Sequence, residues 1–278
     1  MTLERGINPE TGEVGTFVPN GKGYVIRSRE QIEASQRYFE AQRAVFSGRA
    51  YDFTFSVMDA LHEVTSVLTK AQCGYLLLLQ CYVSYGTGRL INADRSPMTT
   101  DDMRKALRMD DRRKKSSFYD FLCKCVSGGI LIANSDGSHS VNDRYHFRGS
   151  TPTGLSVIKS YTAKIKRIYG GVKPEDLGLI YRMLPLVHYA SNTLCTNPGE
   201  KIPEKVAALN RAELAAVIGI SVGEISRRLP KMTVDGEYVI AKVAIGGVES
   251  YMFNPWIFYR KMSVPDETLR TIFRVKAS

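Results

Sequence analysis

Apolar positions recur at helical spacing from Asn210 to Met232, and this stretch has the layout of a helix-turn-helix. Gly219 interrupts the first helix. Ser221 followed by Glu224 forms a capping box that starts the second helix, because the serine side chain accepts a backbone N–H of the first turn and the glutamate reaches back to the cap. The inward positions are Leu214, Ala215 and Val217 in the first helix and Ile225, Leu229 and Met232 in the second.

The next segment predicts a β-hairpin. Tyr238 to Ala244 and Glu249 to Phe253 are rich in β-branched and aromatic residues, and Gly246-Gly247 between them is a turn signal. Helix, turn, helix and hairpin in this order predict a winged helix. Pro230 costs about 3 kcal/mol inside a helix, so the second helix is expected to end near Leu229.

The same order is predicted earlier in the chain. A buried helix is expected from Thr69 to Tyr85, and a short helix capped at Thr99 or Thr100 follows. A further helix carries Phe118, Phe121, Leu122 and Cys125 on one face, and residues 130–141 read as strand, turn and strand. The two helix-turn-helix starts are 111 residues apart (210 − 99), and the asparagines after the wings, Asn142 and Asn254, are 112 apart (254 − 142). Two winged-helix domains of similar plan are therefore expected.

The remaining segments complete the predicted organisation. A helix is expected from Phe55 to Leu68, and another from Leu155 to Tyr169 that carries Lys159 on its outer face. The predicted parts are a partly disordered tail and helix (1–52), a first winged-helix domain (53–149), a linker helix (150–172), a second winged-helix domain (173–262) and a C-terminal helix (263–278). The expected fold class is mainly α with small β-wings, built as tandem winged helix-turn-helix domains joined by the linker helix.

Charge favours a polyanionic partner. The chain has 38 Lys and Arg against 28 Asp and Glu, a formal net charge of +10 and a pI near 9.3. No secretory signal or membrane span is predicted, so a cytoplasmic, nucleoid-associated protein is expected. The five cysteines lie in apolar surroundings and are interpreted as reduced core residues.

Basic and small residues on the outward faces of the two second helices are the candidate DNA contacts. Arg227 is expected to read bases, Arg228 and Lys231 to bind phosphates, and Lys242 to reach the backbone from the wing. The complete candidate set is Arg112, Arg113, Lys114, Lys115, Ser116, Ser221, Val222, Gly223, Ser226, Arg227, Arg228, Lys231 and Lys242. The alternative interpretation is a set of solvated basic runs on ordinary helices.

Catalysis is not predicted. The four histidines, His62, His139, His146 and His188, have neither metal-ligand nor triad spacing. No phosphate-binding loop or dinucleotide fingerprint occurs. The sequence therefore predicts no enzyme activity, no metal and no cofactor.

The second half resembles winged-helix proteins of Firmicute (Bacillus-type) phages and plasmids, including plasmid replication proteins whose wing ends in an Asn-Pro-aromatic segment. The resemblance rests on Glu213, Leu214, Ala215, Gly219, Ser221, Ile225, Ser226, Arg227, Asn254, Pro255, Phe258 and Tyr259. It covers the second half moderately and the first half weakly, and Pro230 departs from the pattern. The resemblance implies binding to double-stranded DNA.

Three functions remain open from the sequence. The first is a phage or plasmid transcriptional regulator, a repressor acting at an operator, with a homodimer expected. The second is a replication initiator or copy-control protein that binds repeated sites at an origin. The third is a protein-interaction scaffold whose basic surface is incidental.

Overall fold

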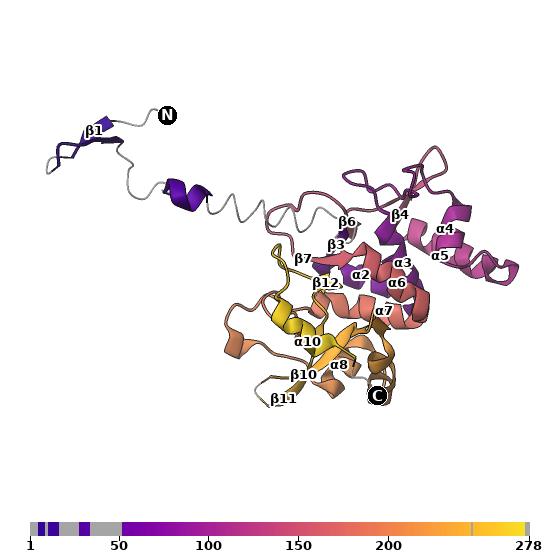
Figure 1. Cartoon of the computed structure of the whole chain (residues 1–278). Helices are drawn as coiled ribbons and strands as arrows, with labels where there is room; N and C mark the ends of the chain where they lie inside the picture. Colours follow the sequence, from indigo (N-terminus) through magenta and orange to yellow (C-terminus); the bar gives the residue numbers. More distant parts are fainter. Residues whose placement is uncertain (1–4, 9–10, 17–27, 34–51, 246, 276–278) are drawn as a thin grey trace. The chain divides into compact units, whose positions relative to one another are not determined.

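The computed structural model describes residues 5–8, 11–16, 28–33, 52–245 and 247–275, and the chain divides into two units, Met1–Val45 and Phe46–Ser278 (Figure 1). In the first unit, β1 (Arg5–Ile7) pairs antiparallel with β2 (Val14–Thr16), and residues 29–33 are helical. The expectation that residues 1–52 are partly disordered stays a prediction. Most of the segment in which the N-terminal helix was expected lies outside the described residues.

The second unit contains two halves with the same order of elements. The first half comprises β3 (Phe53–Val57), α2 (Leu61–Val67), α3 (Lys70–Leu79), α4 (Thr100–Ala106), α5 (Lys115–Ser127), β4 (Leu131–Ala133), β5 (His139–Val141) and β6 (His146–Phe147). Single 3-10 turns, η2 (Met58–Ala60), η3 (Gln80–Tyr82) and η4 (Arg112–Lys114), precede α2, follow α3 and precede α5.

The second half repeats this order with one additional pair of strands. It comprises β7 (Val157–Tyr161), α6 (Thr162–Gly171), α7 (Pro174–Met183), α8 (Arg211–Ile218), α9 (Val222–Arg228), β8 (Thr233–Val234), β9 (Glu237–Tyr238), β10 (Ile240–Ile245), β11 (Val248–Phe253) and β12 (Phe258–Tyr259). Its 3-10 turns are η5 (Leu184–Leu186), η6 (Pro203–Lys205) and η7 (Leu229–Lys231). The chain then forms η8 (Glu267–Leu269) and α10 (Arg270–Phe273).

A four-stranded antiparallel sheet joins the halves and contradicts the expected fold class. Its strand order is β12-β7-β3-β6, so each half contributes one inner and one edge strand. The protein is mixed α/β and not mainly α with small wings. The sheet was missed because its strands are only two to five residues long, and a short apolar run does not distinguish a strand from a helix.

Two predicted helices are wrong for this reason. The segment from Leu155 to Tyr169 is not a linker helix: Val157–Tyr161 is strand β7, and α6 begins only at Thr162. Lys159, expected outside, is 1% exposed in the sheet, and burial lowers its pKa to about 8. Likewise, the helix expected from Phe55 begins as strand β3.

Helices α3 and α7 cross at a pair of glycines. A Cβ atom added to Gly74 in α3 would lie 2.0 Å from the carbonyl oxygen of Pro174, and one added to Gly178 in α7 would lie 1.7 Å from that of Lys70. The two backbones are therefore in direct contact. Gly74 and Gly178 are 104 residues apart (178 − 74), as are the starts of β3 and β7 (157 − 53), so the crossing relates the two halves.

A buried polar layer lies between the sheet and these helices. Gln80 accepts hydrogen bonds from Thr54 and Ser56 at 3.3 and 3.2 Å. His146 on β6 lies 2.9 Å from the Ser56 hydroxyl and 2.8 Å from the Tyr181 hydroxyl on α7. Complete burial lowers the pKa of His146 to about 3, so the imidazole is neutral at physiological pH.

Local predictions fared better than the fold class. Capping boxes form at the expected caps Thr69, Thr99 and Ser221, which start α3, α4 and α9. A further capping box at Asn210, which was not predicted, starts α8. Pro230 lies in the 3-10 turn after α9, so that helix ends where expected. Two details are wrong: Val217, expected inside, is 52% exposed, and Cys123 is exposed although the other four cysteines are buried.

Candidate nucleic-acid interface

The second helix-turn-helix presents a short exposed helix. Gly219 ends α8 with a left-handed φ of 70°, and Ser221 accepts the backbone N–H of Glu224 at 3.2 Å to cap α9. The Ser221 hydroxyl is therefore already engaged in capping α9. Val222 is 44% exposed, and a Cβ added to Gly223 would meet open space, so this turn of α9 is accessible.

The two arginines at the end of α9 have different surroundings. Arg228 forms ion pairs with Asp176 on α7 at 2.8 Å and with Glu224 at 3.1 Å, and the hydrogen bond to Asp176 is the main cause of its raised pKa. Arg227 is exposed and has no ion-pair partner among the described residues. Arg227 is therefore available to an external anion, whereas Arg228 holds α9 against α7.

A shallow cavity of about 500 Å³ extends the accessible basic surface beside α9. Arg227, Lys231 and Lys173 line it together with Arg228 and two acidic residues of α7. Lys173 and Lys231 are exposed and, within the described segments, lack ion-pair partners. Sequence reasoning missed Lys173 because it caps α7, far from α9 in the chain.

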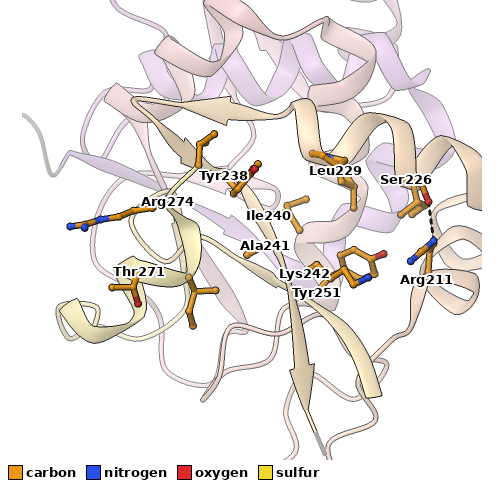
Figure 2. A pocket seen from close by; sticks show the side chains of 14 residues that line it. Arg211, Ser226, Leu229, Tyr238, Ile240, Ala241, Lys242, Tyr251, Thr271 and Arg274 are labelled. Carbon is orange, nitrogen blue, oxygen red and sulfur yellow. Dashed lines mark hydrogen bonds between the residues drawn. The ribbon is translucent and has the colours of Figure 1, made fainter. Parts of the chain in front are cut away.

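A carboxylate on the wing holds two basic side chains. Both carboxylate oxygens of Glu249 on β11 accept hydrogen bonds from the Arg211 guanidinium, at 2.8 and 3.0 Å. Glu249 also forms an ion pair with Lys242 on β10 at 2.5 Å. These hydrogen bonds, led by that from Lys242, lower the pKa of Glu249 to about 2. Arg211 also donates to Ser226 at 3.2 Å (Figure 2). Lys242 and Ser226 therefore both belong to a network that fastens the wing to α8 and α9.

The basic run of the first half precedes α5. Arg112, Arg113 and Lys114 form the 3-10 turn η4 and are not part of α5, which starts at Lys115. Asp111 accepts the backbone N–H of Arg113 at 2.9 Å and pairs with its guanidinium at 3.1 Å.

The side chains of this basic run differ in whether they are hydrogen-bonded within the protein or free to bind an external anion. The Lys114 ammonium donates to the carbonyl of Arg108 at 3.1 Å, so it closes the turn between α4 and α5. Arg112, Lys115 and Ser116 are exposed, and the described residues offer them no side-chain partner. Two cations and one hydroxyl at the start of α5 are therefore free to contact an external anion.

Each helix-turn-helix turn contacts the other half of the molecule. Arg108, in the α4–α5 turn, has a left-handed φ of 52° and donates to the carbonyl of Gly170 at 3.2 Å. Gly219, 111 residues later (219 − 108), accepts Lys70 at 3.3 Å. These reciprocal contacts hold both exposed segments in one unit.

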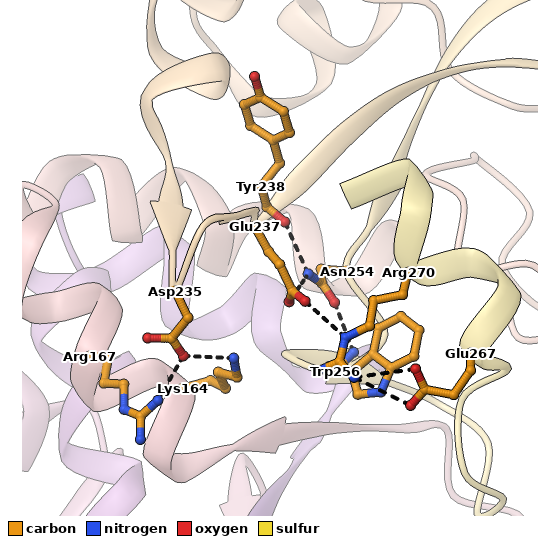
Figure 3. A network of polar contacts seen from close by, with 9 residues as sticks. All are labelled: Lys164, Arg167, Asp235, Glu237, Tyr238, Asn254, Trp256, Glu267 and Arg270. Carbon is orange, nitrogen blue, oxygen red and sulfur yellow. Dashed lines mark hydrogen bonds and ion pairs between the residues drawn. The ribbon is translucent and has the colours of Figure 1, made fainter. Parts of the chain in front are cut away.

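Other residues near the wing are structural. Asn254 donates to the carbonyl of Tyr238 at 3.1 Å and accepts the backbone N–H of Trp256 at 3.0 Å, which fixes the chain after β11. Asp235 binds Lys164 and Arg167, both at 2.7 Å (Figure 3). The Asn-Pro-aromatic segment therefore supports the fold, and two cations of α6 are neutralised.

Comparison with family models, curated proteins and solved structures gives no match. The resemblance to phage and plasmid winged-helix proteins therefore stays a prediction. In the described part of the chain, no helix has the length and apolar character needed to cross a bilayer, and no group of three or more His, Cys, Asp or Glu side chains could hold a metal.

Proposed function

We propose that this protein binds specific double-stranded DNA through two helix-turn-helix segments carried by one unit. The observation that supports this most is the reciprocal contact between each turn and the opposite half, with unpaired basic side chains exposed beside each turn. A short exposed helix with an arginine can reach base edges in a major groove, and flanking cations bind phosphates.

Within this proposal the residues have distinct roles. Arg227 reads bases next to the accessible Gly223, while Lys231 and Lys173 contact phosphates. Arg112 and Lys115 contact phosphates from the first half. Arg228, Ser221 and Lys242 have roles in the fold of the free protein, so they contribute less to binding than the sequence suggested.

Transcriptional regulation is the function we favour for such a protein, since occupying an operator needs only selective DNA binding. The two exposed segments differ in sequence, so one chain would read an asymmetric site without a second copy. That feature also suits a replication initiator at repeated origin sites, which is the second candidate. Homodimer formation remains a prediction that sedimentation of the full chain would test.

Fluorescence anisotropy with labelled duplex at several salt concentrations tests DNA binding itself. The logarithm of the affinity should fall linearly with the logarithm of salt concentration, with about 0.9 added to the slope for each phosphate contact. The double variant Arg112→Ala/Lys115→Ala should weaken binding to all duplexes and flatten the slope. The control Lys201→Ala removes an exposed cation from the loop before α8, outside the residues proposed to contact DNA, and should change neither. Salt-independent or absent binding would favour the protein-interaction scaffold.

A further inference from the structure

A cavity of about 600 Å³ lies against the wing, between α9 and the C-terminal helix α10 (Figure 2). Ile240 and Tyr251 of the hairpin lie on one side, and Leu229 and Pro230 lie beyond the end of α9. Ile272, 39% exposed, contributes apolar surface from α10. Small-molecule sites in proteins have volumes of roughly 300–1,000 Å³ and mostly apolar walls, so both size and lining fit an organic ligand.

The charges around the cavity are unbalanced. Its lining includes Arg211, Lys242 and Arg274 and no acidic side chain. Arg211 and Lys242 share the single carboxylate of Glu249. Arg274 is exposed and, among the residues that the structure describes, has no ion-pair partner. Figure 2 shows Arg274 directed away from Lys242 and Arg211, so one end of the cavity carries a cation that pairs with no carboxylate of the described residues, which favours a ligand with a negative group there.

We propose that this cavity binds a small amphipathic carboxylate, with its apolar body against Pro230 and Ile272 and its carboxylate at Arg274. Hydroxyl groups of Tyr238 and Thr271 in the lining provide further hydrogen-bonding groups. Ser226 and Lys242 line the part of the cavity away from Arg274, on α9 and the wing (Figure 2). Any effect of the bound ligand on DNA affinity depends on the proposed function, whereas binding of the ligand in the cavity does not.

Two fluorescent probes with the same apolar body test this site in the full chain without DNA. Anilinonaphthalene sulfonate carries an anion, and phenylnaphthylamine is its uncharged counterpart. We expect one sulfonate dye per chain and weaker binding of the neutral dye. Because such dyes also bind partly folded states, near-UV circular dichroism must stay native on dye addition. Several dyes per chain, equal affinity for both probes, or loss of the native spectrum would overturn the proposal.

Surface variants locate the site. Arg274→Gln should weaken the sulfonate dye by about five-fold, the effect of losing one charge-assisted contact, and leave the neutral dye unchanged. Thr271→Trp, at an exposed position of α10, should block both dyes by filling the cavity. Lys105→Gln removes an exposed cation from α4 and should alter neither. Unchanged dye binding in both cavity variants would refute the assignment.

Competition separates this proposal from DNA binding. If the dye binds as expected while the wild type fails to bind any duplex, the cavity assignment stands and the proposed function fails. If duplex binds and the dye does not, the cavity assignment fails alone. A series of aliphatic and aromatic carboxylates that displace the dye would then define the preferred ligand body, and failure of every carboxylate to displace it would contradict the ligand class.

Discussion

Adding a methyl group at Gly178 should separate the two halves at their closest contact. The new Cβ would lie 1.7 Å from the carbonyl oxygen of Lys70, whereas ordinary contacts begin near 3.4 Å, so α3 and α7 must move apart by about the difference. The obstacle is helix backbone, which cannot rotate away as a side chain could. Both helices are buried along most of their length, so the movement disturbs the packing of the whole core.

The expected cost follows from two opposing effects. Overpacking a close contact costs typically 1–3 kcal/mol, and a backbone obstacle places this site at about 3 kcal/mol. Alanine is more favourable than glycine by about 1 kcal/mol in a helix interior. The net loss for Gly178→Ala should therefore be about 2 kcal/mol, a large fraction of the stability of an ordinary domain.

Urea unfolding of the full chain measures this loss as a lower midpoint at unchanged slope. Gly223→Ala is the matched control, because its Cβ would meet nothing within 4 Å and its stability should equal or exceed that of the wild type. Gly74→Ala should resemble Gly178→Ala, and the double variant should lose less than the sum, since one separation relieves both contacts. A wild-type midpoint for Gly178→Ala would refute the direct crossing of α3 and α7.

Three further predictions concern charges. Because the folded pKa of His146 is lowered to about 3, the unfolded chain binds the extra proton below about pH 6.5, so His146 should make stability fall by about 1.4 kcal/mol per pH unit from there toward pH 3. Urea midpoints of His146→Gln should lack that contribution, and an unchanged pH dependence would contradict it. Glu249→Gln should strengthen non-specific DNA binding, because Arg211 and Lys242 lose their carboxylate partner. The slope of log affinity against log salt concentration should steepen by about 0.9 for each additional phosphate that the protein binds. A slope like that of the wild type would mean that the freed cations do not reach DNA. Arg228→Ala should lower the unfolding midpoint by removing the partner of Asp176, while Arg227→Ala keeps it; equal midpoints for the two variants would contradict their separate roles.

Local signals in the sequence predicted local structure well. The caps at Thr99 and Ser221 act within three residues, so their hydrogen bonds can be predicted from neighbours in the chain. The offset between Thr99 and Asn210 likewise matches the starts of α4 and α8. The positions of α4 and α8 could therefore be predicted from the sequence alone.

Partners distant in the chain could not be predicted in this way. Thr54 and Ser56 are polar and yet buried, because their hydroxyl groups form hydrogen bonds with Gln80 and His146 on other elements. Sequence pattern alone treats such residues as exposed, which concealed strand β3 and the central sheet. In the candidate site, Arg228 was expected to be free because its partner Asp176 lies 52 residues away.

Selection of bound duplexes from a random DNA library by the full chain tests most directly whether the protein reads a specific DNA sequence. We expect that one asymmetric sequence is enriched, and that Arg227→Ala loses about 1–3 kcal/mol of discrimination at a few of its positions. Enrichment of no sequence by the wild type, or the same enriched sequence with unchanged discrimination for Arg227→Ala, would contradict specific DNA binding through α9.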